Sequence, residues 1–568
     1  MRDSVSAAPE PPTSTLSGQV VSTNPSHEIG LLSLGINQEA RYIGPSSGYF
    51  LARVMLTKRP MLSALKDVGL SSELVEAVQG ELPLPPRALA KRLCDAYFDV
   101  LHPQYPILHE PTIINAVDQI YVGQAAPASE FQVYMVFALG AIALGSQGLR
   151  IPGESYCLSA MKQFEQINIE NSVQGLQCLL LLLLFSIHSP SVRLNAWYLN
   201  YQCIAAVLDL GLQRDITTAS GISLLEQEMR TRIFWVVMML DRTICTMMGR
   251  PIGIRDEACE LRVSLVVHYN IVSLTGVQLP QGVDDFVLSG NADPKSDAMQ
   301  YSVHLFQAVN LNSEIKYVAN SVVRDNTPRY AYPLFTNIVD WQNSVLEKIE
   351  NWATSIPSTI PRLQLICQIR YHNLRMLLLR PSPGIPKPSV TALVKCHSSA
   401  LETIKLFDKL YRNNWLIHNW FAFHGLVLAT LTMLYCIKAE PSIAQDTTSE
   451  ALLRDMGTSL SILSAMGEHW VGVKRCRDIL DDLGRSTIQW MQRTEGIEQT
   501  QTRTRRRETQ IAAATPVASP FAAGHLGDDT LFDPSGYLEP FDFINGSDSV
   551  NMDNIMQSLF QDFIPTYP

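Results

Sequence analysis

Apolar residues recur along most of this chain at intervals of three and four, which is the spacing of one face of an α-helix. The pattern predicts helices at about 87–100, 130–146, 153–168, 172–188, 191–210, 300–323, 331–355, 361–380, 389–411, 415–438, 449–467 and 470–492. Several connections are short, and short connections imply that neighbouring helices run antiparallel. We therefore predict an all-α fold, a large bundle of packed helical hairpins. The proline-rich stretch 101–113 is predicted to be a rigid connection.

One further helix, predicted within Leu224–Ile254, has both of its ends marked in the sequence. Ser223 suits the N-cap, and Gly249 suits the residue just past the last turn. Pro251 prevents the helix from continuing. The apolar face between these ends is wide enough to be buried in a core.

Charged residues lie inside this apolar run, and charges placed against a core must be paired or reach the surface. We expect Arg230, Arg232 and Arg242 to meet carboxylates or helix-end carbonyls of the same domain. We also expect Phe234 and Trp235 to be buried anchors for the surrounding helices. The helix is therefore predicted to be a structural hub, and neither a catalytic nor a DNA-reading element.

Composition divides the chain into four regions. Residues 1–26 are rich in proline, serine and threonine and are predicted to be disordered. Residues 27–84 form a segment ahead of the domain, and residues 85–492 form the helical domain. Residues 493–568 are predicted to be a disordered tail, which is acidic in its last part.

The chemistry of the sequence argues against several functional classes. The net charge of −10 gives no general basic field for gripping nucleic acid. The ten cysteines are never closer than fourteen residues, so the spacing of a zinc cluster is absent. Gly44–Gly48 matches the G-x-S-x-G turn of hydrolases, but no alternation of strands and helices surrounds it, which favours a plain turn. We predict neither an enzyme nor a bound metal or cofactor.

The longest uninterrupted apolar run is Leu176–Ile187. A membrane-spanning helix needs about twenty apolar residues, and this run is shorter. We therefore expect a fully buried helix and no contact with a membrane.

Four stretches in a fixed order point to a family. They read YFDVLHPQYPILHEPT (97–112), AWYLNYQCIAAVLDLGL (196–212), RTRIFWVVMMLDRTICTMMGRPIGI (230–254) and RYHNLRMLLLRPSP (370–383). Together they resemble the regulatory domain of fungal binuclear zinc-cluster transcription factors, called the middle homology region or fungal-specific transcription factor domain. In the third stretch the signature residues are Arg230, Arg232, Phe234, Trp235, Asp241, Arg242, Gly249, Arg250 and Pro251.

The resemblance implies an all-α domain in a nuclear regulator of transcription. In that family a six-cysteine zinc cluster near the N-terminus reads DNA, and a coiled coil often dimerises the protein. No such cluster precedes residue 27 here. Zinc is therefore expected only with a further N-terminal segment, and DNA is expected to be reached through such a segment or indirectly. The sequence leaves a homodimer open.

A departure from the family pattern lies at residues 263–278, VSLVVHYNIVSLTGVQ. These residues are mostly β-branched and carry no charge apart from a histidine, unlike the helices around them. Two interpretations stay open, a retained intron translated into the sequence and a real hairpin-like insertion.

The tail carries two further features. The basic cluster at 503–507 is either a nuclear import signal or a solvated run of charge, and its basic residues are Arg503, Arg505, Arg506 and Arg507. Within 528–563, acidic residues alternate with apolar ones, of which the main ones are Phe532, Phe541, Phe543, Leu559, Phe560 and Phe563. Such a segment can fold on a partner as a short amphipathic helix, which is the pattern of a transcriptional activation segment. An inert acidic tail is the alternative.

These observations lead to one main hypothesis and two alternatives. The main hypothesis is a nuclear transcriptional regulator that activates a metabolic or biosynthetic gene set. Its helical domain would be the regulatory module, and its tail would contact the transcription machinery or co-activators. The alternatives are a co-regulator or scaffold that lacks DNA binding, and a helical small-molecule-binding protein.

Overall fold

The computed structural model of the chain describes residues 30–32, 41–47, 51, 84–146, 148–149, 151–169, 172–189, 194–214, 222–259, 294–320 and 337–512. The predicted disordered N-terminus (1–26), the stretch 263–278 and the candidate activation segment 528–563 lie outside these residues.

Helices make up most of the described structure, and its strands are two of three residues each, which confirms the predicted all-α fold. The first elements are β1 (Gly30–Leu32), β2 (Arg41–Ile43), η2 (Pro45–Ser47), α3 (Arg87–Val100), α4 (Glu110–Tyr121), α5 (Pro127–Gly145), α6 (Gly153–Met161), η3 (Phe164–Gln166), α7 (Val173–His188), α8 (Ala196–Asp209), α9 (Leu224–Met248) and η5 (Asp256–Ala258). The remaining elements are α10 (Pro294–Val318), α11 (Ile338–Thr354), α12 (Pro361–Leu379), α13 (Val390–Arg412), α14 (Trp420–Ala439), α15 (Pro441–Asp446), α16 (Ser449–Gly467) and α17 (Val471–Ala512).

Consecutive helices pack on one another through most of the chain. Close pairs include α5 with α6, α7 with α8, α12 with α13, α13 with α14, and α16 with α17. This is the arrangement of stacked helical hairpins that the short connections predicted. Contacts of α14 with α7 and of α10 with α9 then join the two halves of the chain.

Polar side chains cap the starts of several helices. Ser172, Asn195, Ser223 and Ser389 accept hydrogen bonds from first-turn backbone N–H groups of α7, α8, α9 and α13. Each cap satisfies a donor that has no partner inside its helix. The predicted cap of α9 is therefore confirmed, with Ser223 Oγ accepting from the Glu226 N–H at 3.2 Å.

Helix α4 is an element that the sequence pattern missed. The prediction treated residues 101–113 as a rigid connection, yet α4 begins at Glu110. Pro111 lies in its first turn, where proline is favoured because its missing N–H would have had no partner there. Pro111, the last proline of this stretch, therefore belongs to the first turn of a helix and not to a loop.

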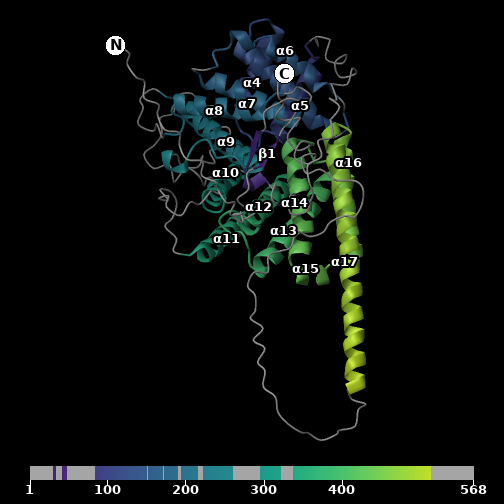
Figure 1. Ribbon diagram of the computed structural model, residues 1–568. Coiled ribbons are helices and arrows are strands. Elements are labelled where there is room, and N and C mark those ends of the chain that lie inside the picture. The colour runs from purple at the N-terminus through teal and green to yellow at the C-terminus, as the bar shows by residue number, and fades with distance from the viewer. Residues whose placement is uncertain are drawn as a thin grey trace, which may run out of the picture.

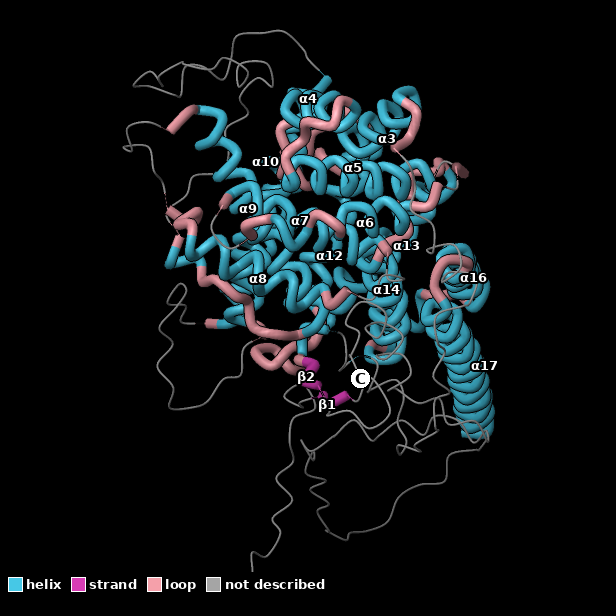
Figure 2. The backbone as a smooth tube through the Cα atoms, turned by 90° about the horizontal axis from the view of Figure 1, so that it is seen from above, coloured by secondary structure: helices cyan, strands magenta, loops and turns pink. Residues whose placement is uncertain are grey.

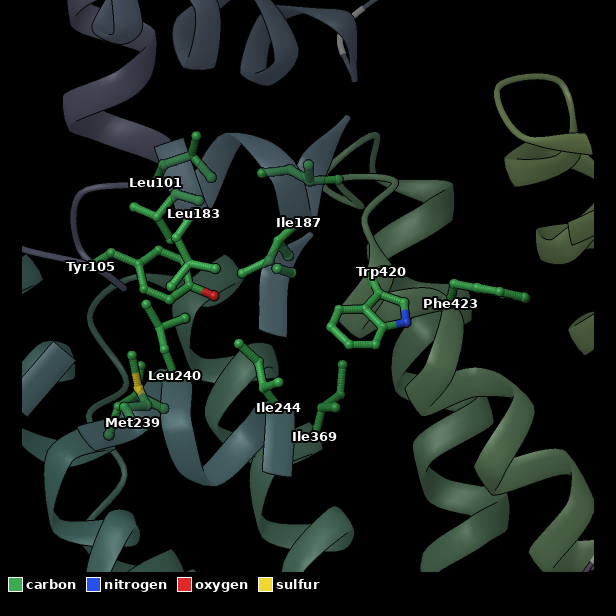
Figure 3. Packing of buried hydrophobic residues seen from close by; sticks show 14 of the residues in the cluster. Leu101, Tyr105, Leu183, Ile187, Met239, Leu240, Ile244, Ile369, Trp420 and Phe423 are labelled. Atoms are coloured by element: carbon green, nitrogen blue, oxygen red, sulfur yellow. The ribbon is translucent and has the colours of Figure 1, made fainter. Parts of the chain in front are cut away.

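Helix α7 lies at the centre of the core. Every residue from Cys178 to His188 is buried, so the helix is covered on all sides. Figure 3 shows Leu183 and Ile187 of α7 near Leu240 and Ile244 of α9. The expectation of a fully buried helix in this apolar run is confirmed.

Two other helices, α5 and α14, are long and apolar enough to cross a membrane by length and composition. However, 72 % of the apolar window of α5 and 83 % of that of α14 are buried inside the bundle. The core helices of a soluble protein pass the same test. We therefore interpret both as core helices of this domain.

Helix α17 continues to Ala512, so the predicted helix end at 492 is too early. The added stretch is rich in glutamine, glutamate and arginine, which favour helix, and Pro516 is the first proline after it. The basic cluster 503–507 therefore lies on this helix. Figure 1 shows α17 extending well beyond the body of the bundle.

The short hairpin of β1 and β2 lies at the edge of the bundle (Figure 2). Its strands are antiparallel, with Gly30 opposite Ile43 and Leu32 opposite Arg41. The element that follows, η2, packs against α9. Residues from the segment ahead of the domain thus reach the end of its central charged helix.

Candidate functional site at the charged end of helix α9

The side chain of Arg242 is the centre of a buried polar cluster. Its Nη1 donates to Asp241 Oδ2 at 2.9 Å, and its Nη2 donates to Asp256 Oδ1 at 2.5 Å and to the Ile254 carbonyl at 2.6 Å. Its Nε donates to Ser313 Oγ at 3.0 Å. Burial disfavours the charge of this guanidinium, but the two carboxylates outweigh burial and raise the pKa of Arg242 above its ordinary value.

Asp241 connects the same cluster to the loop after α9. Its carboxylate accepts hydrogen bonds from Asn200 Nδ2 at 3.1 Å and from the Gly253 N–H at 3.0 Å. Cys245 Sγ lies 3.2 Å from Asp241 Oδ1, and burial together with this carboxylate raises the pKa of the Cys245 thiol. The carboxylate therefore fixes α8, α9 and the loop in one position.

The other two arginines of α9 also find partners inside the domain. Arg230 Nη2 donates to the carbonyl of Leu210, the C-cap of α8, at 2.7 Å. Arg232 Nε pairs with the buried Glu228 one turn earlier at 2.8 Å. The prediction that these arginines meet carboxylates or helix-end carbonyls is confirmed for all three.

The aromatic pair of α9 is buried as predicted. Phe234 is fully buried and Trp235 is 5 % exposed. Their rings meet edge to face, with centroids 5.4 Å apart, and Trp235 also stacks on Phe306 of α10 at 6.3 Å. These contacts anchor α10 to α9.

Gly249 ends α9 in the left-handed conformation, with φ of 68°. A Cβ atom at this residue would lie 2.1 Å from the carbonyl oxygen of Gly44. A Cβ at Gly44 would likewise lie 1.9 Å from the carbonyl oxygen of Gly249. The two glycines therefore allow two backbones, about 200 residues apart, to touch.

The remaining signature residues hold the segment that arrives at this contact. Arg250 Nε donates to the Tyr42 carbonyl at 3.3 Å, and its guanidinium lies 4.4 Å from the centroid of the Trp197 ring. The Pro251 carbonyl accepts a hydrogen bond from Tyr201 Oη at 3.5 Å. The Gly249–Pro251 turn is thus a docking point for the hairpin and for α8.

The turn that docks there comprises residues 44–47 and is called the Ser46 turn below. The Gly44 N–H donates to the Met248 carbonyl at 3.1 Å, and Ser46 Oγ donates to the Thr246 carbonyl at 2.9 Å. Ser47 Oγ bonds the Gly44 carbonyl at 2.7 Å within the turn. The G-x-S-x-G match is therefore a hydroxyl-capped turn, as predicted.

Two cations that the sequence reasoning missed lie against this turn. Lys316 Nζ donates to Ser46 Oγ at 2.7 Å and to the Cys245 carbonyl at 3.3 Å. Arg380 Nη2 donates to the Ser46 carbonyl. Burial lowers the pKa of Lys316 to about 8 and that of Arg380 to about 10. The available signal was a cation beside apolar helical residues, Lys316 within α10 and Arg380 at the end of α12, but no sequence pattern paired either with Ser46.

The site has the chemistry of a structural junction. Among the described residues, no group of three or more histidine, cysteine or acidic side chains could hold a metal ion. All three predicted arginines of α9 are engaged inside the domain. The side chains of the basic cluster on α17 and of the tail residues Phe532–Phe563 lie outside the described structure.

Part of this chain matches the sequence model of a known protein family. Residues 94–273 match the family model described as "Fungal specific transcription factor domain". This region therefore has the sequence of a fungal-specific transcription factor domain. Helices α4 to α9, with Arg242 and both of its carboxylate partners, lie inside the matched region. Ser313, the Ser46 turn, Lys316 and Arg380 lie outside it.

Curated relatives of this domain are regulatory proteins. "Protein STB5" of Saccharomyces cerevisiae is 25 % identical over 71 % of this chain and 54 % of its own length. "Pyrimidine pathway regulatory protein 1" of the same yeast is 25 % identical over 46 % of this chain and 28 % of its own length. "Positive regulator of purine utilization" of Emericella nidulans is 20 % identical over 82 % of this chain and 55 % of its own length.

The chain therefore spans between about a quarter and about a half of the length of these relatives. Two of these three names describe regulation, and none of the three names a catalytic activity. The family and its relatives are transcription factors and not enzymes, in agreement with the sequence-based prediction.

Proposed function

We propose that this chain is a nuclear regulator of transcription whose helical domain is the regulatory module. The observation that carries the proposal is the match of residues 94–273 to the fungal-specific transcription factor domain. Relatives named for pyrimidine and purine pathways support control of a metabolic or biosynthetic gene set. The internal pairing of Arg230, Arg232 and Arg242 supports a regulatory role for α9 over a DNA-reading one.

We further propose that the tail is an activation segment. After Arg507 the chain contains no lysine or arginine, and acidic residues alternate there with aromatic and leucine side chains. Carboxylates keep such apolar side chains in water until a partner groove buries them. Co-activators or the transcription machinery are the partners of this chemistry.

The test of activation is a reporter assay in which residues 508–568 are fused to a heterologous DNA-binding domain. We expect activation that is lost when the six apolar positions are changed to alanine, namely Phe532, Phe541, Phe543, Leu559, Phe560 and Phe563. The matched control changes six residues outside 528–563, in 508–527, to alanine or serine and should keep its activity. No activation by the unaltered fusion would refute an activating role for the tail.

The nuclear location is tested separately, in the full chain. Changing Arg503, Arg505, Arg506 and Arg507 to glutamine should move a fluorescently tagged chain from the nucleus to the cytoplasm if this cluster directs import. Glutamine favours helix about as well as arginine, so α17 should persist. A nuclear signal that survives these changes would assign import to another part of the chain.

A co-regulator that acts without contacting DNA is the second candidate function. The internal pairing of Arg230, Arg232 and Arg242 favours it, because it engages these arginines within the domain. Chromatin immunoprecipitation of the natural full-length protein distinguishes the two. Occupancy that disappears when a partner factor is deleted supports the co-regulator, and occupancy that persists supports direct DNA binding.

A further inference from the structure

Lys316 and Arg380 differ from the other buried cations at this site, because neither has a carboxylate partner. Lys316 is 8 % exposed and Arg380 is 2 % exposed. Neither forms an ion pair with any residue of the described structure, whereas Arg232 and Arg242 both do. Arg380 Nη1 is buried with no hydrogen-bond partner.

Two unneutralised cations in a protein interior are energetically costly. Desolvation of an ammonium or guanidinium group is offset well only by an opposite charge with good geometry. Asp241 is a carboxylate whose charge acts on Lys316, but its oxygens are already bonded to Arg242, Asn200 and Gly253. The two cations also repel each other, since Arg380 lowers the pKa of Lys316.

The Ser46 turn supplies the oxygens that these cations do bond. The hydroxyl of Ser46 accepts from Lys316, and the carbonyl of the same residue accepts from Arg380. Both oxygens are neutral, so they do not compensate the two positive charges. They occupy the positions that two oxygens of a bound oxyanion would fill. A carboxylate or phosphate would give shorter, charge-assisted hydrogen bonds with the same two donors.

The turn is attached to α9 by backbone and side-chain contacts at Gly44 and Ser46. Two hydrogen bonds join it to the end of α9, from the Gly44 N–H and from Ser46 Oγ. The close approach of Gly44 to Gly249 adds van der Waals contact. Local opening of this short turn exposes fewer residues than global unfolding does and therefore costs less free energy.

We propose that Lys316 and Arg380 form a binding site for a small oxyanion, a carboxylate or phosphate compound, which replaces the oxygens of Ser46 and releases the Ser46 turn from α9. The site lies outside the region matched by the family model and gives the regulatory domain an input. It stands on the geometry of these residues and goes beyond the proposed role in transcription. The ligand affects α9 because the turn rests on the carbonyls of Thr246 and Met248.

Hydrogen exchange read by mass spectrometry on the full chain tests the proposal. Sodium phosphate and sodium succinate are titrated separately, each against sodium chloride of equal ionic strength. We expect a saturable increase of about tenfold or more in the exchange of the Gly44 N–H with at least one of the two anions, because its bond to Met248 is lost. A response to phosphate alone or to succinate alone identifies the chemistry of the ligand.

Three variants make the result specific. Arg380→Gln should abolish the response to the anion. Ser46→Ala keeps both cations but removes the hydroxyl that competes with the anion for Lys316. The anion concentration at half-maximal response should therefore fall severalfold in this variant. Lys348→Gln is the matched control, because Lys348 already pairs with Glu314 at 3.0 Å, and it should respond as the unaltered chain does.

Several outcomes would overturn the proposal. One is hydrogen exchange at residues 42–47 that depends on ionic strength alone. The others are a response to the anion that persists in Arg380→Gln, and a titration midpoint that is the same in Ser46→Ala as in the unaltered chain. Ser46→Ala keeps the proposal open to refutation even if Arg380→Gln does not fold. Reporter activation by the tail uses a different readout, so failure of either proposal leaves the other unaffected.

Discussion

At the scale of single residues, the charges of α9 show how a core accommodates arginine. Arg242 is 1 % exposed, and two carboxylates, a carbonyl and a hydroxyl accept hydrogen bonds from it. A planar guanidinium can reach all four at once, whereas a lysine ammonium acts as a single point. The cluster therefore depends on arginine and not merely on positive charge.

Arg242→Lys should lower the free energy of unfolding by about 3 kcal/mol or more, because it leaves buried carboxylates incompletely paired. Urea unfolding followed by circular dichroism measures the loss. Arg485→Lys is the control, since Arg485 pairs with Asp481 on the surface, and its unfolding midpoint should not change. Equal midpoints for both variants would contradict the role given to Arg242.

Trp235→Ala should lower the free energy of unfolding by about 3–5 kcal/mol, because it removes a large buried ring that stacks on Phe306. The measurement is the melting temperature together with the urea midpoint. Trp415 is 36 % exposed, so Trp415→Ala should cost clearly less. An unchanged melting curve for Trp235→Ala would reject the anchoring role.

At the scale of elements, the ends of α9 were predictable and its partners were not. Ser223, Gly249 and Pro251 mark the helix through local rules of capping and backbone geometry, which act within a few residues. The bonds of Arg242 to Ser313, and of Ser46 to Lys316, join residues 71 and 270 positions apart. No local pattern encodes such distances, so the candidate anion site emerged only from the folded chain.

The two boundary errors have the same origin. A proline-rich stretch was interpreted as a connection although Pro111 sits where a helix accepts proline, in the first turn of α4. The end of α17 was placed at 492 because composition changes there, although the residues that follow still favour helix. In both places composition was misleading: the position of Pro111 was decisive for α4, and helix propensity was decisive for α17.

The junction of α9 with the hairpin gives a prediction about glycine. Gly249→Ala should destabilise the domain by more than about 1 kcal/mol, because alanine is strained at a φ of 68° and its Cβ would overlap the Gly44 carbonyl. Gly457 lies within α16 with open space around it, so Gly457→Ala should stabilise the chain slightly. Thermal unfolding of the two variants should therefore shift in opposite directions.

At the scale of the whole molecule, the size of the core makes stability depend on pH. Burial lowers the pKa of His188 and His304 to about 4 and that of His424 to about 3. Their side chains stay neutral in the folded chain at pH 5, whereas an unfolded histidine takes up a proton below about pH 6.5. The unfolded state then binds more protons, so stability falls as the pH falls from 6.5 towards 4.

Each of these histidines should contribute a slope of about 1.4 kcal/mol per pH unit in that window. Urea midpoints measured from pH 7 to pH 5 should fall accordingly. His304→Phe should make the fall less steep, because phenylalanine keeps the stacking on Trp352, at 4.4 Å between centroids, and cannot bind a proton. A flat profile in the unaltered chain would contradict the neutral burial of these side chains.

The contact between the Ser46 turn and Arg380 also limits when this part of the domain can fold during synthesis. The two residues are separated by 334 positions, and synthesis proceeds from the N-terminus at about 5–20 residues per second. Ser46 leaves the ribosome on the order of tens of seconds before its partner exists. During that interval the end of α9 and Lys316 are made without the last donor that holds the turn. Completion of this junction therefore waits for Arg380, at a time when α13 to α17 have still to be made.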